Sequence, residues 1–246
     1  MNGRRHRLAR TGVRRRQHGG TQTARPGNDR CIIGYLMVEP LLALLNDVAS
    51  GRYPVPDGSV TVLPQPSARH AGVFGFTAHT VIAANVDPEW VGDQLPDGDL
   101  AAPLGPRFLS ALCERTGRRI GSIDMLCVTR PLPGPPPVDL TPANATQHPR
   151  VARARRYRDE VCAWDADGGV LLLGRGVTGR WEAAVEVDSE RRNEGLGRKL
   201  ATAARHLAPD GVPLWAQIAP GNAASVRAFL AAGFTPVGAE ALLVAE

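Results

Sequence analysis

The stretch over residues 181–207 constrains the fold more than any other part of this 246-residue chain. In Trp181-Glu-Ala-Ala-Val-Glu-Val187, residues 181, 183, 185 and 187 share one face and residues 182, 184 and 186 the other, an alternation typical of a strand. From Leu196 onward, apolar residues fall at 196, 200, 203, 204 and 207, which is the spacing of a helix. The turn between them contains Gly195 and Gly197. The sequence therefore predicts a strand that passes through a glycine turn into a helix.

The start of this helix is suited to binding an anion such as a phosphate. The first N–H groups of a helix have no partner within it, and the helix dipole places partial positive charge at the same end. A glycine has no Cβ to hold a ligand away from the backbone. Arg192, Arg198 and Lys199 add full positive charges. The alternative is that the two glycines only form the corner at which the helix begins.

A second strand and helix follow at once. Residues 213–219 have the composition of a strand, and Gly221-Asn222 forms a turn in which Asn222 is the expected N-cap. Residues 223–232 have helical spacing, and Gly233 is the expected left-handed residue at the helix end, with Phe234 as its apolar follower.

These residues resemble the GNAT acyltransferase superfamily. The family's pyrophosphate loop, Arg/Gln-x-x-Gly-x-Gly/Ala, is matched by Arg192-Asn193-Glu194-Gly195-Leu196-Gly197. The family's next helix typically reads Asn-x-x-small-x-x-x-Tyr-x-x-x-Gly-Phe, and Asn222, Ser225, Phe229, Gly233 and Phe234 stand at those positions. Phe229 departs from the pattern, because many members have tyrosine there. The resemblance covers about residues 150–246.

The resemblance implies a mixed α/β fold of the GNAT acyl-CoA N-acyltransferase type in the C-terminal half, with acetyl-CoA as co-substrate. The pyrophosphate would lie on the glycine turn and the pantetheine arm along the backbone of the 185–187 strand, where that strand and the next one splay apart. A backbone N–H there would polarise the thioester carbonyl. The cofactor-binding residues implied are Val185, Val187, Arg192, Asn193, Gly195, Leu196, Gly197, Arg198, Asn222, Ser225 and Phe229.

Direct attack by an amine needs a proton acceptor but no nucleophile from the enzyme. The chain has no Ser/His/Asp or Cys/His constellation, which agrees with that mechanism. Glu186 and Glu182 are the candidate proton acceptors, and each has the alternative of being a solvated strand residue. Phe229 cannot protonate the leaving thiolate as a tyrosine would, so Ser225 or water must do so, or the thiolate leaves unprotonated.

The net charge of +5 is set by one end of the chain. Residues 1–30 carry nine arginines and one acid, whereas the remainder has 20 basic and 23 acidic residues. We therefore expect no general basic surface for nucleic acid on the folded part. Residues 1–36 are interpreted as a disordered basic extension, upstream of a natural start at Met37. A basic arm that binds nucleic acid is the alternative.

Several other classes of protein are disfavoured by the sequence. The apolar run over 31–45 is interrupted by Glu39 and Pro40 and lacks a signal-peptide cleavage motif, and no later segment is long and apolar enough to span a membrane. The four cysteines have neither metal-ligand spacing nor a disulfide pattern, so we expect reduced thiols, no metal and a cytoplasmic location. The oligomeric state is left open.

The sequence of the first half predicts an α+β domain over 37–130, smaller than the C-terminal domain. A helix is expected from Met37 to Val48, strands at 60–63, 72–76, 79–86 and 122–129, and a helix at 107–115. Their order parallels the C-terminal half, with 107–115 and 122–129 standing where 196–207 and 213–219 stand later, which favours a degenerate second copy of the same fold without the glycine turn. An unrelated α+β domain is the alternative.

Prolines at 131–142 predict an extended linker over 131–145 between this domain and the C-terminal domain, 146–246. In the latter, a solvated basic helix is expected at 148–157, followed by a hairpin with its turn at 165–169.

We expect an N-acetyltransferase that moves the acetyl group of acetyl-CoA to a small-molecule amine or a peptide N-terminus. A catalytically weak or inactive acyl-CoA-binding protein is the alternative, and Phe229 is the residue that motivates it.

Overall fold

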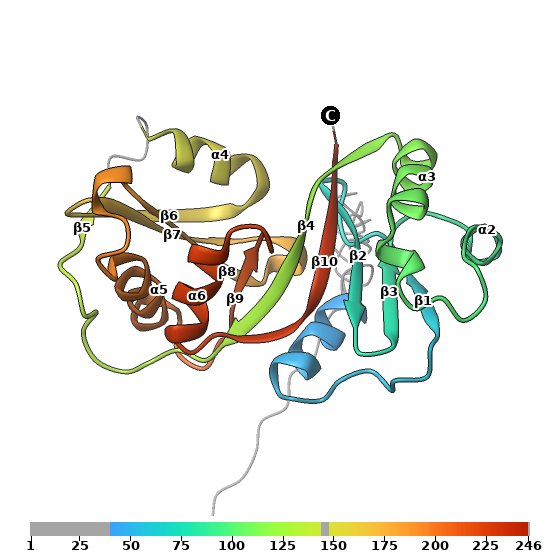
Figure 1. Cartoon of the computed structure of the whole chain (residues 1–246), viewed down its shortest axis with the longest axis horizontal. Coiled ribbons are helices and arrows are strands. Elements are labelled where there is room, and N and C mark those ends of the chain that lie inside the picture. The colour runs from blue at the N-terminus through green and yellow to red at the C-terminus, as the bar shows by residue number, and fades with distance from the viewer. Residues whose placement is uncertain (1–39, 144–147, 246) are drawn as a thin grey trace, which may run out of the picture.

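The computed structural model describes residues 40–143 and 148–245, and in it ten strands form one mixed sheet (Figure 1). The strand order is β1-β3-β2-β10-β4-β9-β8-β7-β6-β5. The strands are β1 (Val60–Leu63), β2 (His70–Phe76), β3 (His79–Ala83), β4 (Arg118–Thr129), β5 (Thr141–Pro142), β6 (Asp159–Ala166), β7 (Gly169–Arg175), β8 (Trp181–Val187), β9 (Leu214–Ile218) and β10 (Thr235–Ala245). The helices are 40–49, α2 (Pro88–Gln94), α3 (Pro106–Thr116), α4 (Pro149–Tyr157), α5 (Leu196–Leu207) and α6 (Ala223–Ala231).

The helices cover the two faces of this sheet. The helix over 40–49 packs on a cluster that contains Phe74, Leu126 and Trp215. α4 covers another part of the same face, over Val170 and Leu172. The two clusters lie on one face of the sheet. Trp215 is paired with Glu182 on β8, so their side chains share a face. Ala184, two residues after Glu182, shares that face and packs against the α4 cluster. The opposite face is covered by α2 and α3 at one end of the sheet and by α5 and α6 at the other.

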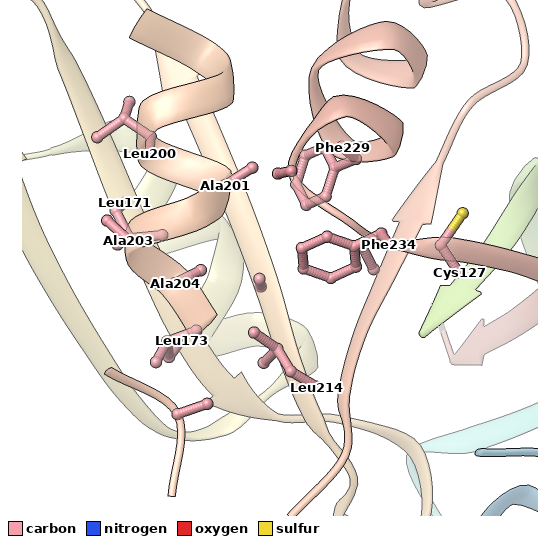
Figure 2. Packing of buried hydrophobic residues seen from close by; sticks show 14 of the residues in the cluster. Cys127, Leu171, Leu173, Leu200, Ala201, Ala203, Ala204, Leu214, Phe229 and Phe234 are labelled. Carbon is pink, nitrogen blue, oxygen red and sulfur yellow. The ribbon is translucent and has the colours of Figure 1, made fainter. Parts of the chain in front are cut away.

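The cluster under α5 and α6 supports the predicted strand–turn–helix unit (Figure 2). Leu200, Ala201 and Ala204 of α5 are fully buried, and the small alanines let the helix lie close to the sheet. Phe229 and Phe234 pack edge to face, with their ring centroids 4.9 Å apart. The predicted alternation of β8 is confirmed, since Ala183, Val185 and Val187 contact this cluster.

The strands of the two halves interleave in the sheet. β4 lies between β9 and β10, and it pairs antiparallel with both. β10 in turn pairs with β2. Strands from both sides of the proline-rich segment thus build one sheet, and the predicted division into domains stays a prediction.

The strand order does not repeat in the way that the copy hypothesis expects. In the C-terminal half, β9 follows α5 and pairs in parallel with β8. β4 follows α3 in the same way, but the partners of β3 are β1 and β2. The expected correspondence of 122–129 with 213–219 is therefore not reproduced.

Most of the local predictions agree with the structure to within a few residues, and some elements were not expected. Gly233 has a positive φ at the end of α6, as predicted, and Gly117 has one at the end of α3. β10 and α2 had no counterpart among the predictions. The segment after β4 packs against α5, because Leu132 N–H donates to the Arg205 carbonyl and Val138 and Leu140 contact the α5 cluster. Its assignment as a linker between domains stays a prediction. The basic extension over 1–36 and the start at Met37 lie outside the described residues.

Candidate functional site

The parallel strands β8 and β9 separate partway along their length. Their ladder consists of Trp181 with Leu214 and Glu182 with Trp215, whereas β8 continues to Val187 and β9 to Ile218. Beyond these two pairs the strands are not paired with each other, and Arg150 and Arg192 donate to the Val185 and Val187 carbonyls. Backbone groups on an unpaired strand edge suit an extended ligand. The structure thus has an opening in the pairing of β8 with β9, at the C-terminal ends of the two strands.

Two helices begin at this end of the sheet. α5 follows the C-terminal end of β8, and α6 follows that of β9, so their positively polarised N-termini lie on the same side. Gly195 has φ +81° directly before α5, and a Cβ there would meet nothing within 4 Å. A Cβ on Gly197 would lie 3.6 Å from Ala228 Cβ and 3.7 Å from Val187 Cγ2. The glycine turn, the end of β8 and α6 therefore converge.

The charged side chains of the turn have different partners. Arg191 binds Asp167 of the β6–β7 turn at 2.7 Å and Glu194 at 3.0 Å, which fixes the turn against that hairpin. These carboxylates also raise the pKa of Arg191. Arg192 is exposed and its Nε donates to the Val187 carbonyl at 3.4 Å. Arg198 and Asn193 are also exposed, and Asn193 has a positive φ of 67°. Arg192 and Arg198 are thus exposed at the turn, where a ligand could meet them.

The predicted residues of α6 divide between its start and the core. Asn222 is the N-cap, and its side-chain oxygen accepts from the Ser225 backbone N–H at 3.1 Å. Ser225 is half-buried in the first turn of α6. Phe229 is only 4% exposed and belongs to the cluster under α5 and α6. Asn222 and Ser225 thus lie at the C-terminal end of β9, whereas Phe229 is a core residue in this structure.

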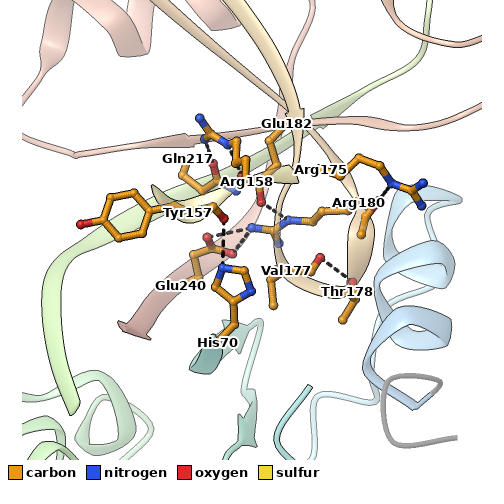
Figure 3. Close-up of polar contacts among 11 residues, drawn as sticks. His70, Tyr157, Arg158, Arg175, Val177, Thr178, Arg180, Glu182, Gln217 and Glu240 are labelled. Atoms are coloured by element: carbon orange, nitrogen blue, oxygen red, sulfur yellow. Dashed lines mark hydrogen bonds and ion pairs between the residues drawn. The ribbon is translucent and has the colours of Figure 1, made fainter. Parts of the chain in front are cut away.

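Glu182 is held in a buried ion-pair network (Figure 3). Arg158 Nε donates to one of its oxygens at 2.6 Å, and Arg180 Nε donates to the other at 2.8 Å. Burial opposes the charge of Glu182, but the two guanidinium groups outweigh it and lower the pKa of this carboxyl to about 2. Such a group is a poor proton acceptor near neutral pH. The geometry therefore argues for a structural role of Glu182 and against the catalytic role considered from the sequence.

The same network extends to β9 and β10. Arg180 Nη2 donates to both oxygens of Glu240, at 2.8 and 2.7 Å, and its guanidinium lies over the Trp215 ring, 5.4 Å from the centroid. Glu240 is buried next to Glu182, so burial raises its pKa to about 7 despite Arg180. Arg158 Nη2 donates to the Gln217 side-chain oxygen at 3.1 Å. The network thus joins the strands at the point where β8 and β9 part.

Glu186 lies further along β8, on the face covered by α4. Its carboxylate is 3.6 Å from Arg150 Nη1, and Arg150 Nη2 donates to the Val185 carbonyl at 3.4 Å. The side chain of Glu186 is 47% exposed. It remains accessible to a substrate at the opening.

Helix α4 differs from the solvated basic helix that the sequence predicts. Val151 and Ala154 are buried against β7 and β8, and Arg150 and Arg158 lie over the site. Sequence reasoning missed these two arginines. A signal for a partly buried helix was present in the sequence. Val151, Ala154 and Tyr157 recur at helical spacing among basic residues, which is the pattern of a helix with one apolar face.

Other site types receive no support from the described residues. In the described ranges 40–143 and 148–245, no group of three or more His, Cys, Asp or Glu residues could hold a metal ion. No helix in that part of the chain is long and apolar enough to cross a membrane. A surface hollow of about 520 Å³ lies beside Arg69, Asp159 and Thr178, and it is lined by none of the residues predicted from the sequence.

Comparisons with known proteins gave only distant structural similarity. No family model and no curated protein matches the chain. A GCN5-related N-acetyltransferase from Kribbella flavida aligns with a TM-score of 0.37 and 18% identity, covering 56% of this chain and 63% of that one. A GNAT-family acetyltransferase from Colwellia psychrerythraea aligns with a TM-score of 0.37 and 15% identity, covering 56% and 61%. The match thus spans about three fifths of each of these structures, and at these scores it carries no argument for the proposals below.

Proposed function

We propose that this chain is an N-acyltransferase that transfers an acetyl group from acetyl-CoA to an amine. The observation that carries the proposal is the opening between β8 and β9, flanked by the N-termini of α5 and α6 and by the glycine turn at Gly195 and Gly197. An open strand edge suits an extended amide-containing chain, and a glycine turn at a helix N-terminus suits a pyrophosphate. Acetyl-CoA has both parts, joined in one molecule.

The cofactor side of the site is proposed as follows. The backbone of the turn from Asn193 to Arg198, Leu196 included, binds the pyrophosphate, with Arg192 adding charge. The pantetheine arm pairs with the open edge of β8 at Val185 and Val187, and Asn222 contacts it from α6. A backbone N–H of β8 polarises the thioester carbonyl, which stabilises the developing oxyanion. Phe229 is proposed to support this surface from the core.

The acceptor amine approaches from the face covered by α4. Its nitrogen lone pair forms the new C–N bond while the C–S bond of the thioester breaks, and the amine proton passes to a carboxylate. Glu186 is the sequence-derived candidate that remains accessible, whereas Glu182 is occupied by two arginines. The thiolate takes a proton from Ser225 or from water. The acceptor is proposed to be a small-molecule amine or a peptide N-terminus, and the cytoplasmic location stays a prediction.

The test is calorimetric titration of the full chain with acetyl-CoA, followed by a thiol-release assay with a panel of amines, amino acids and short peptides. We expect one acetyl-CoA per chain and turnover with at least one acceptor. Acetyl-pantetheine, which lacks the pyrophosphate, is the control ligand and should bind far more weakly. Absence of acetyl-CoA binding would refute the proposal, and binding without any turnover would indicate an acyl-CoA-binding protein.

A further inference from the structure

Asp124 of β4 lies at the same end of the sheet as the opening. β4 pairs with β9 through Met125 opposite Ile218 and Leu126 opposite Gln217, so Asp124 stands just beyond the last residue of β9. Its side chain shares a face with that of Leu126, two residues away, and therefore with Gln217. That face is the one covered by α4 and bearing Glu186. Asp124 and Glu186 thus lie on the same face, on the two strands that flank β9, and Glu186 borders the opening directly.

The surroundings of Asp124 differ from those of the other carboxylates on this face. Ser122 Oγ donates to its Oδ1 at 2.9 Å. The positive charge of Arg153 on α4 lowers the pKa of Asp124. Glu240, its direct neighbour on β10, is already bound by Arg180. Gln217 on β9 is uncharged. Half-burial raises the pKa of Asp124, while Ser122 and Arg153 act in the opposite direction. Asp124 is therefore a stronger base than an exposed aspartate.

The two carboxylates of β8, Glu182 and Glu186, are less suited to take a proton. Glu182 is bound by Arg158 and Arg180 through both of its oxygens. Glu186 has Arg150 at 3.6 Å and a largely solvated side chain. Within residues 40–143 and 148–245, Ser122 is the one hydrogen-bond donor to Asp124, and the other carboxylate oxygen has no donor from that part of the chain.

We propose that Asp124 is a further catalytic residue and takes the proton from the acceptor amine, directly or through one water. This inference rests on the proposed function. As the C–N bond forms and the C–S bond breaks, the amine N–H proton passes to the Asp124 carboxylate, and the thiolate leaves and is protonated by water. The acceptor site is then formed by residues from both halves of the chain, because β4 precedes the proline-rich segment and β8 follows it.

The experiment compares turnover and its pH dependence in the full chain with the substitutions Asp124→Asn and Ser122→Ala, using acetyl-CoA and an acceptor found in the amine panel. Asp124→Asn keeps an oxygen to accept from Ser122, so the fold should persist, and kcat should fall on the order of a hundredfold or more. The Kd for acetyl-CoA should not change. Asp210→Asn, at an exposed loop position away from β4, is the matched control and should keep full turnover.

Ser122→Ala supplies a readout that a purely structural role would not move. It leaves the carboxylate in place but removes a hydrogen bond that lowers its pKa. The acidic limb of the pH profile of kcat should therefore move to higher pH. Arg153→Ala removes a positive charge and should move the limb in the same direction.

The failures of this inference and of the proposed function are distinguishable. If the wild-type chain neither binds nor consumes acetyl-CoA, the proposed function fails and the inference fails with it. If the wild-type chain turns over but Asp124→Asn keeps its kcat, the inference alone is overturned. An acidic limb that stays in place in Ser122→Ala, or a larger loss of kcat in Glu186→Gln than in Asp124→Asn, would also overturn it.

Discussion

Replacing Gly195 by Asp should abolish acetyl-CoA binding without unfolding the chain. A Cβ at this position meets no atom within 4 Å, so the backbone has room for a side chain. The backbone has φ +81°, a conformation that costs an L-residue about 1–2 kcal/mol, and aspartate tolerates it better than most residues. An acid at a helix N-terminus recovers about 0.3–1 kcal/mol of this cost. We therefore expect the melting temperature of the ligand-free variant to fall by no more than about 7 °C.

The effect on the ligand should be far larger. Two like charges about 4 Å apart near a protein surface repel by on the order of 4 kcal/mol, or about a thousandfold in affinity. Acetyl-CoA at 100 times its Kd stabilises a protein by about 2.7 kcal/mol, which is a rise of about 5–10 °C for a chain of this size. Differential scanning fluorimetry with and without acetyl-CoA should show this rise in the wild-type chain and none in Gly195→Asp.

Gly197→Ala is the matched control for that experiment. Its Cβ would make ordinary contacts with Ala228 and Val187, and alanine is favoured over glycine in a helix by about 1 kcal/mol. Alanine also satisfies the last position of the loop motif. This variant should therefore be at least as stable as the wild type and keep its response to acetyl-CoA. The same ligand-induced rise in Gly195→Asp would refute the assignment of the turn to the pyrophosphate.

Three further predictions concern the network and the cap. Glu182→Gln removes the charge that two buried guanidinium groups share, so urea denaturation should show a loss of about 3–5 kcal/mol; a fall in kcat at unchanged stability would instead mark Glu182 as the proton acceptor. The pKa of Glu240 is about 7 in the folded chain, against 4.5 as its ordinary value. Its contribution to stability is therefore full below pH 4.5 and is lost as the pH rises through 7. The loss is on the order of 3 kcal/mol. Glu240→Gln should therefore show a flatter dependence of the melting temperature on pH between 5 and 8, and an unchanged slope would contradict this. Asn222→Ala should cost about 1 kcal/mol through the lost N-cap bond to Ser225, and an unchanged free energy of unfolding would show that the cap is dispensable.

The features predictable from the sequence are those encoded locally. The alternation of residues 181–187, the left-handed Gly233 and the cap at Asn222 each depend on a few neighbouring residues, and the structure confirms them. The same is true of the glycine turn, whose conformation follows from Gly195 itself.

The features that were missed depend on residues far apart in the sequence. Glu182 has the pattern of a strand residue facing outward, and nothing near it indicates that Arg158 and Arg180 will bury it. The position of Asp124 near the end of β9 depends on the pairing of β4 with β9, which the sequence does not indicate. The sequence did contain a signal for Asp124, because this acid directly precedes the apolar run Met125–Val128 in an expected strand. A charged side chain is costly to bury in a strand, so its presence there indicates a specific role. The pairing of β10 with β2 and β4 has no local signature at all.

The position of β4 also has a consequence for how the chain folds. Both edges of this twelve-residue strand are paired with strands made much later in the chain, after β5, β6, β7 and β8 have all been synthesised. Until β9 and β10 emerge from the ribosome, β4 presents two open edges with the apolar residues Leu126 and Val128 on one face, which is the state most prone to aggregate. Contacts of such long sequence separation also slow folding. A fragment that ends before β9 should therefore need chaperones to stay in solution, and adding the missing C-terminal piece in trans should restore the closed sheet.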